Sequence, residues 1–151
     1  MEPIDFKVPP VIKTIVYAGP AEAAFDRFTL NIGAWWPLAT HSLGRTDDPS
    51  SVRFEPLEAG APLVERCRSG AVHVWGSIID IRRPHVIRFT WHVGRDPDTA
   101  QQIEVAFDAN DDGTTRVTLT HSGWERLGDG ALDARNGYNT GWDFVLGVYS
   151  D

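Results

Sequence analysis

The sequence predicts an α+β domain with a helix-grip arrangement, in which one curved antiparallel sheet wraps around a single long C-terminal helix. Apolar and polar residues alternate along six segments between residues 52 and 121, a pattern typical of strands with one buried and one solvated face. The connections between these segments are too short for helical crossovers, so neighbouring strands are expected to be antiparallel. From Leu127 to Tyr149 the apolar residues recur at the spacing of one face of a helix. A single helix that carries large aromatic side chains on one face needs a curved sheet to cover that face.

The N-terminal part of the chain predicts one strand followed by one or two short helices. Residues 11–17 are mostly β-branched and apolar and are expected to form the first strand. Gly19-Pro20 ends this strand, and Pro20 is suited to the first turn of a helix. Apolar residues then recur at helical spacing from Ala21 to Ile32, so that Trp35-Trp36 fall at a turn or in a second short helix. The polar, turn-rich residues 37–51 predict a loop.

Six further strands are expected where polar and apolar residues alternate, at residues 52–55, 63–68, 71–81, 87–92, 102–107 and 116–121. With the first strand they complete a seven-stranded sheet. The segment 71–81 changes faces part-way, which predicts a β-bulge near Gly76. The run Asn110-Asp111-Asp112-Gly113 is a strong hairpin signal. Gly128 and Gly130 indicate that the regular C-terminal helix begins only after them.

Length and composition exclude several classes of protein. A chain of 151 residues is expected to be a single domain, residues 1–151. Its 21 acidic and 14 basic residues give a formal net charge of −7, which argues against nucleic acid as a partner. Because no apolar run approaches about 18 residues and the start MEPIDFKVPP lacks an apolar signal core, we expect no membrane span and a cytoplasmic protein. The single Cys67 excludes an intrachain disulfide.

An ordered set of short motifs covers nearly the whole chain. They are Pro20 to Phe25, Trp35-Trp36-Pro37, His41-Ser42, Glu55-Pro56 with Gly60, Glu65-Arg66, Trp75-Gly76 running into Arg83-Pro84, Phe89-Thr90-Trp91, Gly113-Thr114 leading to His121-Ser122-Gly123-Trp124, and Tyr138 with Gly141-Trp142. In this order they resemble the SRPBCC (START-like) superfamily, and within it the branch named after the C-terminal domain of the activator of heat-shock-protein-90 ATPase. The resemblance implies a seven-stranded antiparallel sheet gripping the last helix, with a cavity between them. It does not imply one activity, because that fold serves carriers, cyclases and chaperone partners.

Two titratable residues fall on the predicted inner face of the sheet. His121 shares its face with Val117 and Leu119, where it could act as general acid or base in a cavity wall, or be a neutral histidine satisfied by a backbone carbonyl or a Tyr hydroxyl. Glu65 lies between apolar neighbours, where desolvation would tend to raise its pKa. It could anchor or protonate a carbonyl-bearing ligand, or instead form an ion pair with a residue such as Arg53.

Large aromatic side chains are the other candidates for a cavity wall. The chain has six tryptophans, and a buried indole N–H needs a hydrogen-bond acceptor, which Glu65 or a backbone carbonyl could supply. The candidates are Trp36, Phe54, Trp75, Trp91, Tyr138 and Trp142. Taken singly each is better explained as core, and it is the set as a whole that points to a cavity. His41 lies in the long loop, which could form a lid over the cavity, while the adjoining Ser42 could simply cap a short helical turn.

Three functions remain open at this point. The first is a protein that binds a small apolar or aromatic molecule between the sheet and the last helix. The second is a polyketide cyclase- or dehydratase-like enzyme using His121 or Glu65 for proton transfer. The third is a chaperone-associated or stress-response module that binds another protein, and a homodimer is compatible with all three. The histidines lack metal-binding spacing and the glycines lack nucleotide-binding patterns, so we expect neither a metal nor a cofactor.

Overall fold

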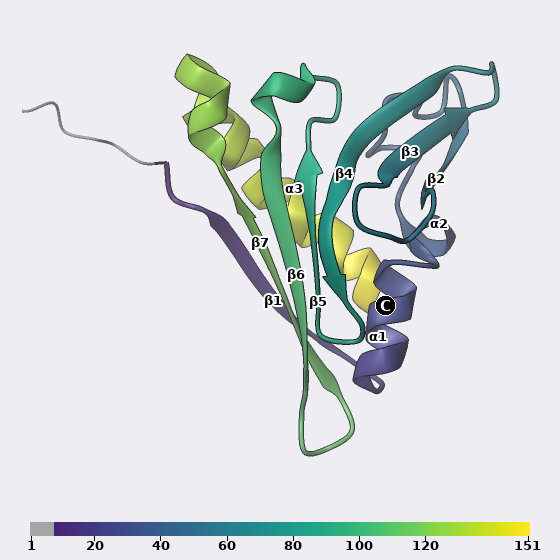
Figure 1. The fold of residues 1–151 in the computed structure, drawn as a ribbon, viewed down its shortest axis with the longest axis vertical. Coiled ribbons are helices and arrows are strands. Elements are labelled where there is room, and N and C mark those ends of the chain that lie inside the picture. Colours follow the sequence, from purple (N-terminus) through teal and green to yellow (C-terminus); the bar gives the residue numbers. More distant parts are fainter. Residues whose placement is uncertain (1–7) are drawn as a thin grey trace, which may run out of the picture.

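The structure, a computed structural model, describes residues 8–151 (Figure 1). Its elements in chain order are β1 (Val11–Tyr17), α1 (Ala21–Phe28), α2 (Ile32–Trp35), β2 (Ser50–Phe54), β3 (Pro62–Cys67), β4 (Val72–Arg82), β5 (Val86–Trp91), η1 (Pro97–Thr99), β6 (Gln101–Ala109), β7 (Thr115–Ser122), η2 (Trp124–Gly130) and α3 (Ala131–Ser150). The predicted order of elements is confirmed, and Trp35 ends the second short helix. The long helix begins directly after Gly130, as its glycines indicate.

All seven strands form one antiparallel sheet in the order β1-β7-β6-β5-β4-β3-β2. In the view of Figure 1, α3 runs behind β5 and β6, across one face of the sheet. Its side chains Trp142, Val145, Leu146 and Tyr149 are buried against that face. The helix-grip fold is therefore confirmed. No helix within residues 8–151 is long and apolar enough to cross a membrane.

The predicted bulge lies at Trp75. Leu63 pairs with Gly76 and Val64 with Val74, so Trp75 is the extra residue opposite β3. A Cβ atom on Gly76 would come within 1.7 Å of the backbone oxygen of Thr90, which only glycine avoids. The bulge turns Trp75 inward, where its side chain is fully buried.

One end of the core fixes α3 against α1. Tyr149 packs against Phe28 and Trp35 with ring centroids 5.5 and 5.0 Å apart. Its hydroxyl donates a hydrogen bond of 2.6 Å to the carbonyl of Ala24. Arg27 donates from Nε to the carbonyl of Tyr149 at 2.8 Å, so a cation lies at the C-terminal end of the α3 dipole. These contacts join the last turn of α3 to α1 and α2.

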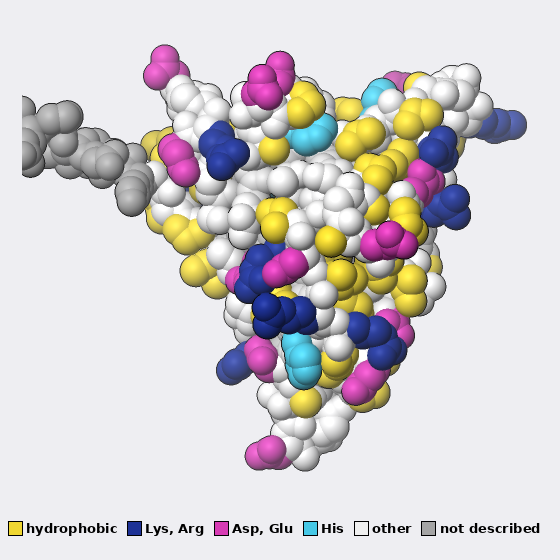
Figure 2. Space-filling view, viewed as in Figure 1, with side chains coloured by type: hydrophobic (Ala, Val, Ile, Leu, Met, Phe, Trp, Pro, Cys, Tyr) yellow, Lys and Arg dark blue, Asp and Glu magenta, His cyan; other side chains and the backbone are white. Residues whose placement is uncertain are grey.

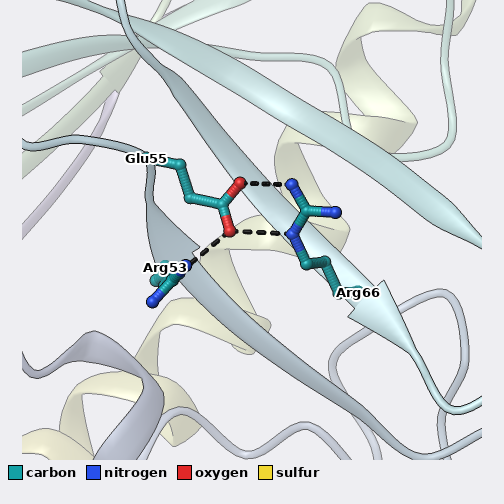
Figure 3. Close-up of polar contacts among 3 residues, drawn as sticks. All are labelled: Arg53, Glu55 and Arg66. Carbon is teal, nitrogen blue, oxygen red and sulfur yellow. Dashed lines mark hydrogen bonds and ion pairs between the residues drawn. The ribbon is translucent and has the colours of Figure 1, made fainter.

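The outer surface mixes charged and apolar side chains (Figure 2). On the hairpin of β2 and β3, Glu55 accepts two hydrogen bonds from Arg66, at 2.8 and 2.7 Å, and one from Arg53 at 2.9 Å (Figure 3). These two guanidinium groups, Arg66 first, lower the pKa of Glu55 to about 2. Exposed large apolar residues of the sheet lie in two groups, on β1 and on β4, which are separated by three strands.

Candidate ligand pocket

A hollow of about 210 Å³ lies between the loop after α2, the end of β5 and the middle of α3. Its lining residues are Trp36, Thr40, His41, Ser42, Leu43, Arg45, Trp91, Val93, Tyr138, Gly141, Trp142 and Val145. We call this hollow the main pocket. A second hollow of about 350 Å³ shares His41, Tyr138 and Gly141 with it and adds Arg95, Ala134 and Gly137; we call it the side pocket.

Three tryptophans from three different elements form the inner wall of the main pocket. The ring centroids of Trp36, Trp91 and Trp142 lie 5.6 to 6.0 Å from one another. The indole N–H of Trp36 donates to the carbonyl of His41 at 2.7 Å, and that of Trp91 to the hydroxyl oxygen of Tyr138 at 3.0 Å. Because these donors are already satisfied, the rings are held in place and present mainly apolar surface to the pocket.

Glu65, from β3, holds the loop that closes one side of the pocket. Its Oε1 accepts from the backbone N–H of Leu43 and the indole of Trp75, both at 3.0 Å. Its Oε2 accepts from the backbone N–H of Gly44 at 3.0 Å and from the hydroxyl of Ser50 at 2.6 Å. The carboxylate therefore joins the middle of the loop and the first residue of β2 to the bulged strand β4. It is fully buried and does not line the main pocket.

The environment of Glu65 corrects two expectations. Desolvation alone raises its pKa, but hydrogen bonds from Ser50, the loop amides and Trp75 together hold the pKa below its ordinary value. The expected partner Arg53 instead binds Glu55 and pairs in register with Val64. Glu65 is thus a buried anion stabilised by neutral donors, and it is ionised at neutral pH. An ionised carboxylate committed to four donors cannot serve as a proton donor to a ligand.

His121, from β7, also has both of its polar atoms bound within the protein, and it lies behind Trp142 of the wall. Its Nδ1 accepts from the indole N–H of Trp142 at 3.0 Å, so the proton of the neutral ring is on Nε2. Nε2 lies 3.2 Å from Oε1 of Gln101, and the amide of Gln101 is oriented by its own donation to the carbonyl of Thr99 at 2.7 Å. Burial lowers the pKa of His121 to about 3. The ring is neutral, fixed as one tautomer and outside the main pocket.

His41 is the histidine that lines the pocket. A turn of the loop places His41 at the pocket. The backbone N–H of His41 donates to the carbonyl of Pro37 at 2.8 Å, and Ser42 Oγ donates to the carbonyl of Leu38 at 2.6 Å. The ring stacks on Phe144 of α3 with centroids 4.9 Å apart, and its Nδ1 lies 2.7 Å from the hydroxyl of Thr40. Desolvation, followed by the charge of Arg45, lowers the pKa of His41, so the ring is neutral at pH 7.

The structure divides the sequence-predicted candidates into two groups. Trp36, His41, Trp91, Tyr138 and Trp142 line the main pocket. Phe54, Glu65, Trp75 and His121 are buried outside it; Glu65 binds Trp75 and His121 binds Trp142, so they support its walls.

Some lining residues had a sequence signal and others had none. Gly141 and Val145 belong to the same helical stripe as Tyr138 and Trp142, and that spacing could have identified them. Arg45 had no comparable signal, because only the loop conformation places it at the pocket.

A wider hollow of about 490 Å³ lies on the other face of the sheet, where outward-facing side chains such as Thr90, Gln102 and Ser122 line it together with residues 8–10. Its lining contains no aromatic ring. Binding sites for small organic molecules are concave and mostly apolar with a few polar groups, a description that fits the smaller main pocket better.

The fold and the pocket define a helix-grip protein with a hollow between the sheet and the last helix. A family model described as Activator of Hsp90 ATPase homolog 1-like protein matches residues 19–146. The chain belongs to this family, which is part of the SRPBCC superfamily. The resemblance recognised in its motifs is thereby confirmed. A search of curated proteins found no significant match.

Solved structures share this fold. The chain is similar to an anthrahydroquino-γ-pyrone synthase, Txn09, complexed with SUM: 35% of residues are identical, 84% of each chain is covered, and the TM-score is 0.58. It is also similar to protein MLL2253 from Mesorhizobium loti, with 15% identity, 93% of each chain covered and a TM-score of 0.66. An Hsp90 activator from Plasmodium falciparum, PFC0360w, is 22% identical over 76% of this chain and 73% of that chain, with a TM-score of 0.54. The last two show the fold alone.

Proposed function

We propose that this protein binds a small aromatic or hydrophobic molecule in the main pocket. The observation that carries the proposal is the wall of Trp36, Trp91 and Trp142, whose indole donors are satisfied within the protein. A ligand ring can contact these surfaces without first breaking a hydrogen bond, and preorganisation of this kind strengthens binding. The polar groups around the wall, from Thr40, His41 and Tyr138, then orient the ligand.

The volume limits the size of the ligand. Pockets for drug-sized molecules measure roughly 300–1,000 Å³, so the 210 Å³ of the main pocket is small. The side pocket continues it past His41, Tyr138 and Gly141. A molecule of one or two fused rings suits the main pocket, with larger substituents directed into the side pocket.

Two glycines of α3 provide a matched test. Gly141 lines both hollows and Gly147 lines neither, and a Cβ atom at either position would meet nothing within 4 Å. The Gly141→Leu variant therefore fills the pocket without opening the core, and Gly147→Leu makes the same change elsewhere on the helix. Calorimetric titration with 2-naphthalenemethanol should detect binding to the wild type and to Gly147→Leu and at least about tenfold weaker binding to Gly141→Leu. Equal binding by all three proteins would place the ligand elsewhere.

A second candidate is a ring-forming enzyme, favoured by the 35% identity to an anthrahydroquino-γ-pyrone synthase. With Glu65 and His121 committed to structural hydrogen bonds, His41 is the group available to transfer a proton in the pocket. In γ-pyrone ring closure the phenol oxygen bonds to the ketone carbon, and its proton passes through the base to the former ketone oxygen, which gives a cyclic hemiketal. The hemiketal hydroxyl then leaves with a proton from the adjacent CH₂ carbon as water, and the ring C=C bond forms. General-base catalysis contributes roughly 10²- to 10⁴-fold to rate.

The test for this second candidate uses 1-(2-hydroxyphenyl)butane-1,3-dione, whose ring closure with loss of water gives 2-methylchromone. The wild type should accelerate the appearance of the chromone, and His41→Phe should lose that acceleration while still binding 2-naphthalenemethanol. Acceleration that persists in His41→Phe would exclude His41 as the base. A wild type that binds but gives no acceleration with this diketone leaves binding as the better description.

A further inference from the structure

We propose that the main pocket is selective for aromatic ligands that carry an anionic oxygen, and that Arg45 binds that oxygen. This inference rests on the proposed function, since it concerns which small molecules the pocket accepts.

The backbone of Arg45 adopts a conformation that arginine disfavours. Its φ is +49°, and it is the only non-glycine residue with positive φ among residues 8–151. A side chain in the left-handed region costs energy that glycine would not. In this conformation the backbone N–H of Arg45 donates to Oγ of Ser42 at 2.9 Å. Strain of this kind is concentrated at functional sites, and here it places the arginine side chain at an aromatic pocket.

The guanidinium of Arg45 has no ion-pair or hydrogen-bond partner within the described part of the chain. Two acids of the same loop network are engaged elsewhere, since Glu65 accepts from the loop amides and Asp48 accepts from the N–H and the hydroxyl of Ser69. Asp47, two residues from Arg45, is exposed and forms no ion pair with it among the described residues. On the neighbouring hairpin, by contrast, Arg53 and Arg66 both form ion pairs with Glu55. A protein with seven excess negative charges thus keeps an uncompensated cation at this pocket.

A second such cation lies at the side pocket. Arg95 lines it and likewise has no side-chain partner among the residues that the structure describes. Both arginines are solvent-exposed, so they lie at the rim, while the tryptophan wall lies inside. An anionic group held at the rim keeps part of its hydration, and its ring is buried against the wall. A carboxylate suits Arg45 because the planar guanidinium donates two parallel hydrogen bonds to it.

The experiment compares two ligands that share one ring system. 2-Naphthoate is anionic at pH 7 and 2-naphthalenemethanol is neutral. By calorimetric titration in about 50 mM salt, the wild type should bind the naphthoate about tenfold more tightly, as one charge-assisted contact is worth about that factor. The Arg45→Gln variant should bind both ligands equally. Arg82→Gln is the matched control, because Arg82 is exposed at the far end of β4, and it should keep the preference.

Arg45→Gly is a second variant that removes the charge and also suits the left-handed backbone, so it should fold and should lose the preference. Raising the salt to about 0.5 M should reduce the preference in the wild type by screening. A wild type that binds both ligands equally overturns this inference and leaves the proposed function intact. Binding of neither ligand overturns the proposed function as well. A preference retained by Arg45→Gln and Arg45→Gly removes the assignment to Arg45.

Discussion

Replacing Glu65 with Gln tests whether one buried carboxylate holds the pocket loop in place. The substitution preserves shape and removes the charge. The new amide can keep its oxygen toward Leu43 and Trp75, and its NH₂ can donate to the hydroxyl of Ser50, which is free to rotate. The N–H of Gly44 then faces a donor instead of an acceptor. An orphaned buried donor costs about 1–3 kcal/mol, and the loss of charge from the other bonds adds to it. We expect a loss of about 2–3 kcal/mol in unfolding free energy.

Urea unfolding followed by tryptophan fluorescence measures this loss. With a denaturant dependence of about 2 kcal/mol/M, the middle of the range for small proteins, the midpoint should fall by about 1–1.5 M. The control is Glu58→Gln, because Glu58 is exposed and has no side-chain partner among the described residues. Its midpoint should stay within about 0.3 M of the wild type, as surface substitutions rarely exceed 0.5 kcal/mol. If Glu65→Gln were as stable as Glu58→Gln, the carboxylate would not be what holds the loop.

The pH dependence of the stability of the same variant independently checks the direction of the Glu65 pKa shift. The folded-state pKa of Glu65 lies below the unfolded value of about 4.3, so the folded protein favours the ionised form. The resulting stabilisation is complete above the unfolded pKa and is lost as the pH falls through the folded pKa. Glu65→Gln has no such titration. The stability gap between wild type and variant should therefore be widest near pH 7 and should narrow on acidification. A gap that widens toward low pH would contradict a lowered pKa.

Two further predictions concern His121 and the glycine positions. His121, with its pKa held at about 3 by burial, should still show the neutral Nε2–H tautomer in long-range ¹H–¹⁵N spectra at pH 5, and an imidazolium pattern there would refute the assignment. Because the unfolded chain takes up this proton below its pKa of about 6.5, His121 should make stability fall as the pH drops from there toward 3. Gly76→Ala should lower the unfolding free energy by about 2–3 kcal/mol through overpacking against Thr90, whereas Gly147→Ala, on an open helix face, should raise it by up to about 1 kcal/mol. Thermal unfolding separates the two, and an unaffected Gly76→Ala would show that the backbone yields at the bulge.

The fold could be predicted from the sequence because periodicity reports directly on which face of each element is buried. The alternation around Val117 and Leu119 correctly placed His121 inside, and the failure of alternation around Trp75 located the bulge. The site was harder to predict from the sequence. Alternation tells which side of the sheet a residue faces, but not whether its polar atoms are hydrogen-bonded to residues of other elements. Gln101 and Trp142 come from other elements and satisfy His121, and no spacing in the sequence brings them together.

The two buried polar residues that most resembled catalysts are better understood as supports of the aromatic wall. A tryptophan packed in a core loses the water bound to its indole N–H, so the hydrogen bond is kept only where a protein acceptor replaces that water. Glu65 supplies that acceptor for Trp75, and His121 supplies it for Trp142, so each polar residue determines where one indole ring lies. Their own burial is tolerated because Glu65 has four donors and His121 is neutral. Under the proposed function, polar contacts to a ligand therefore fall to pocket-lining residues such as His41 and Arg45. Substitution of Glu65 or His121 should change stability and binding together, while Arg45→Gln, which keeps a side chain of similar length, should change the preference between anionic and neutral ligands.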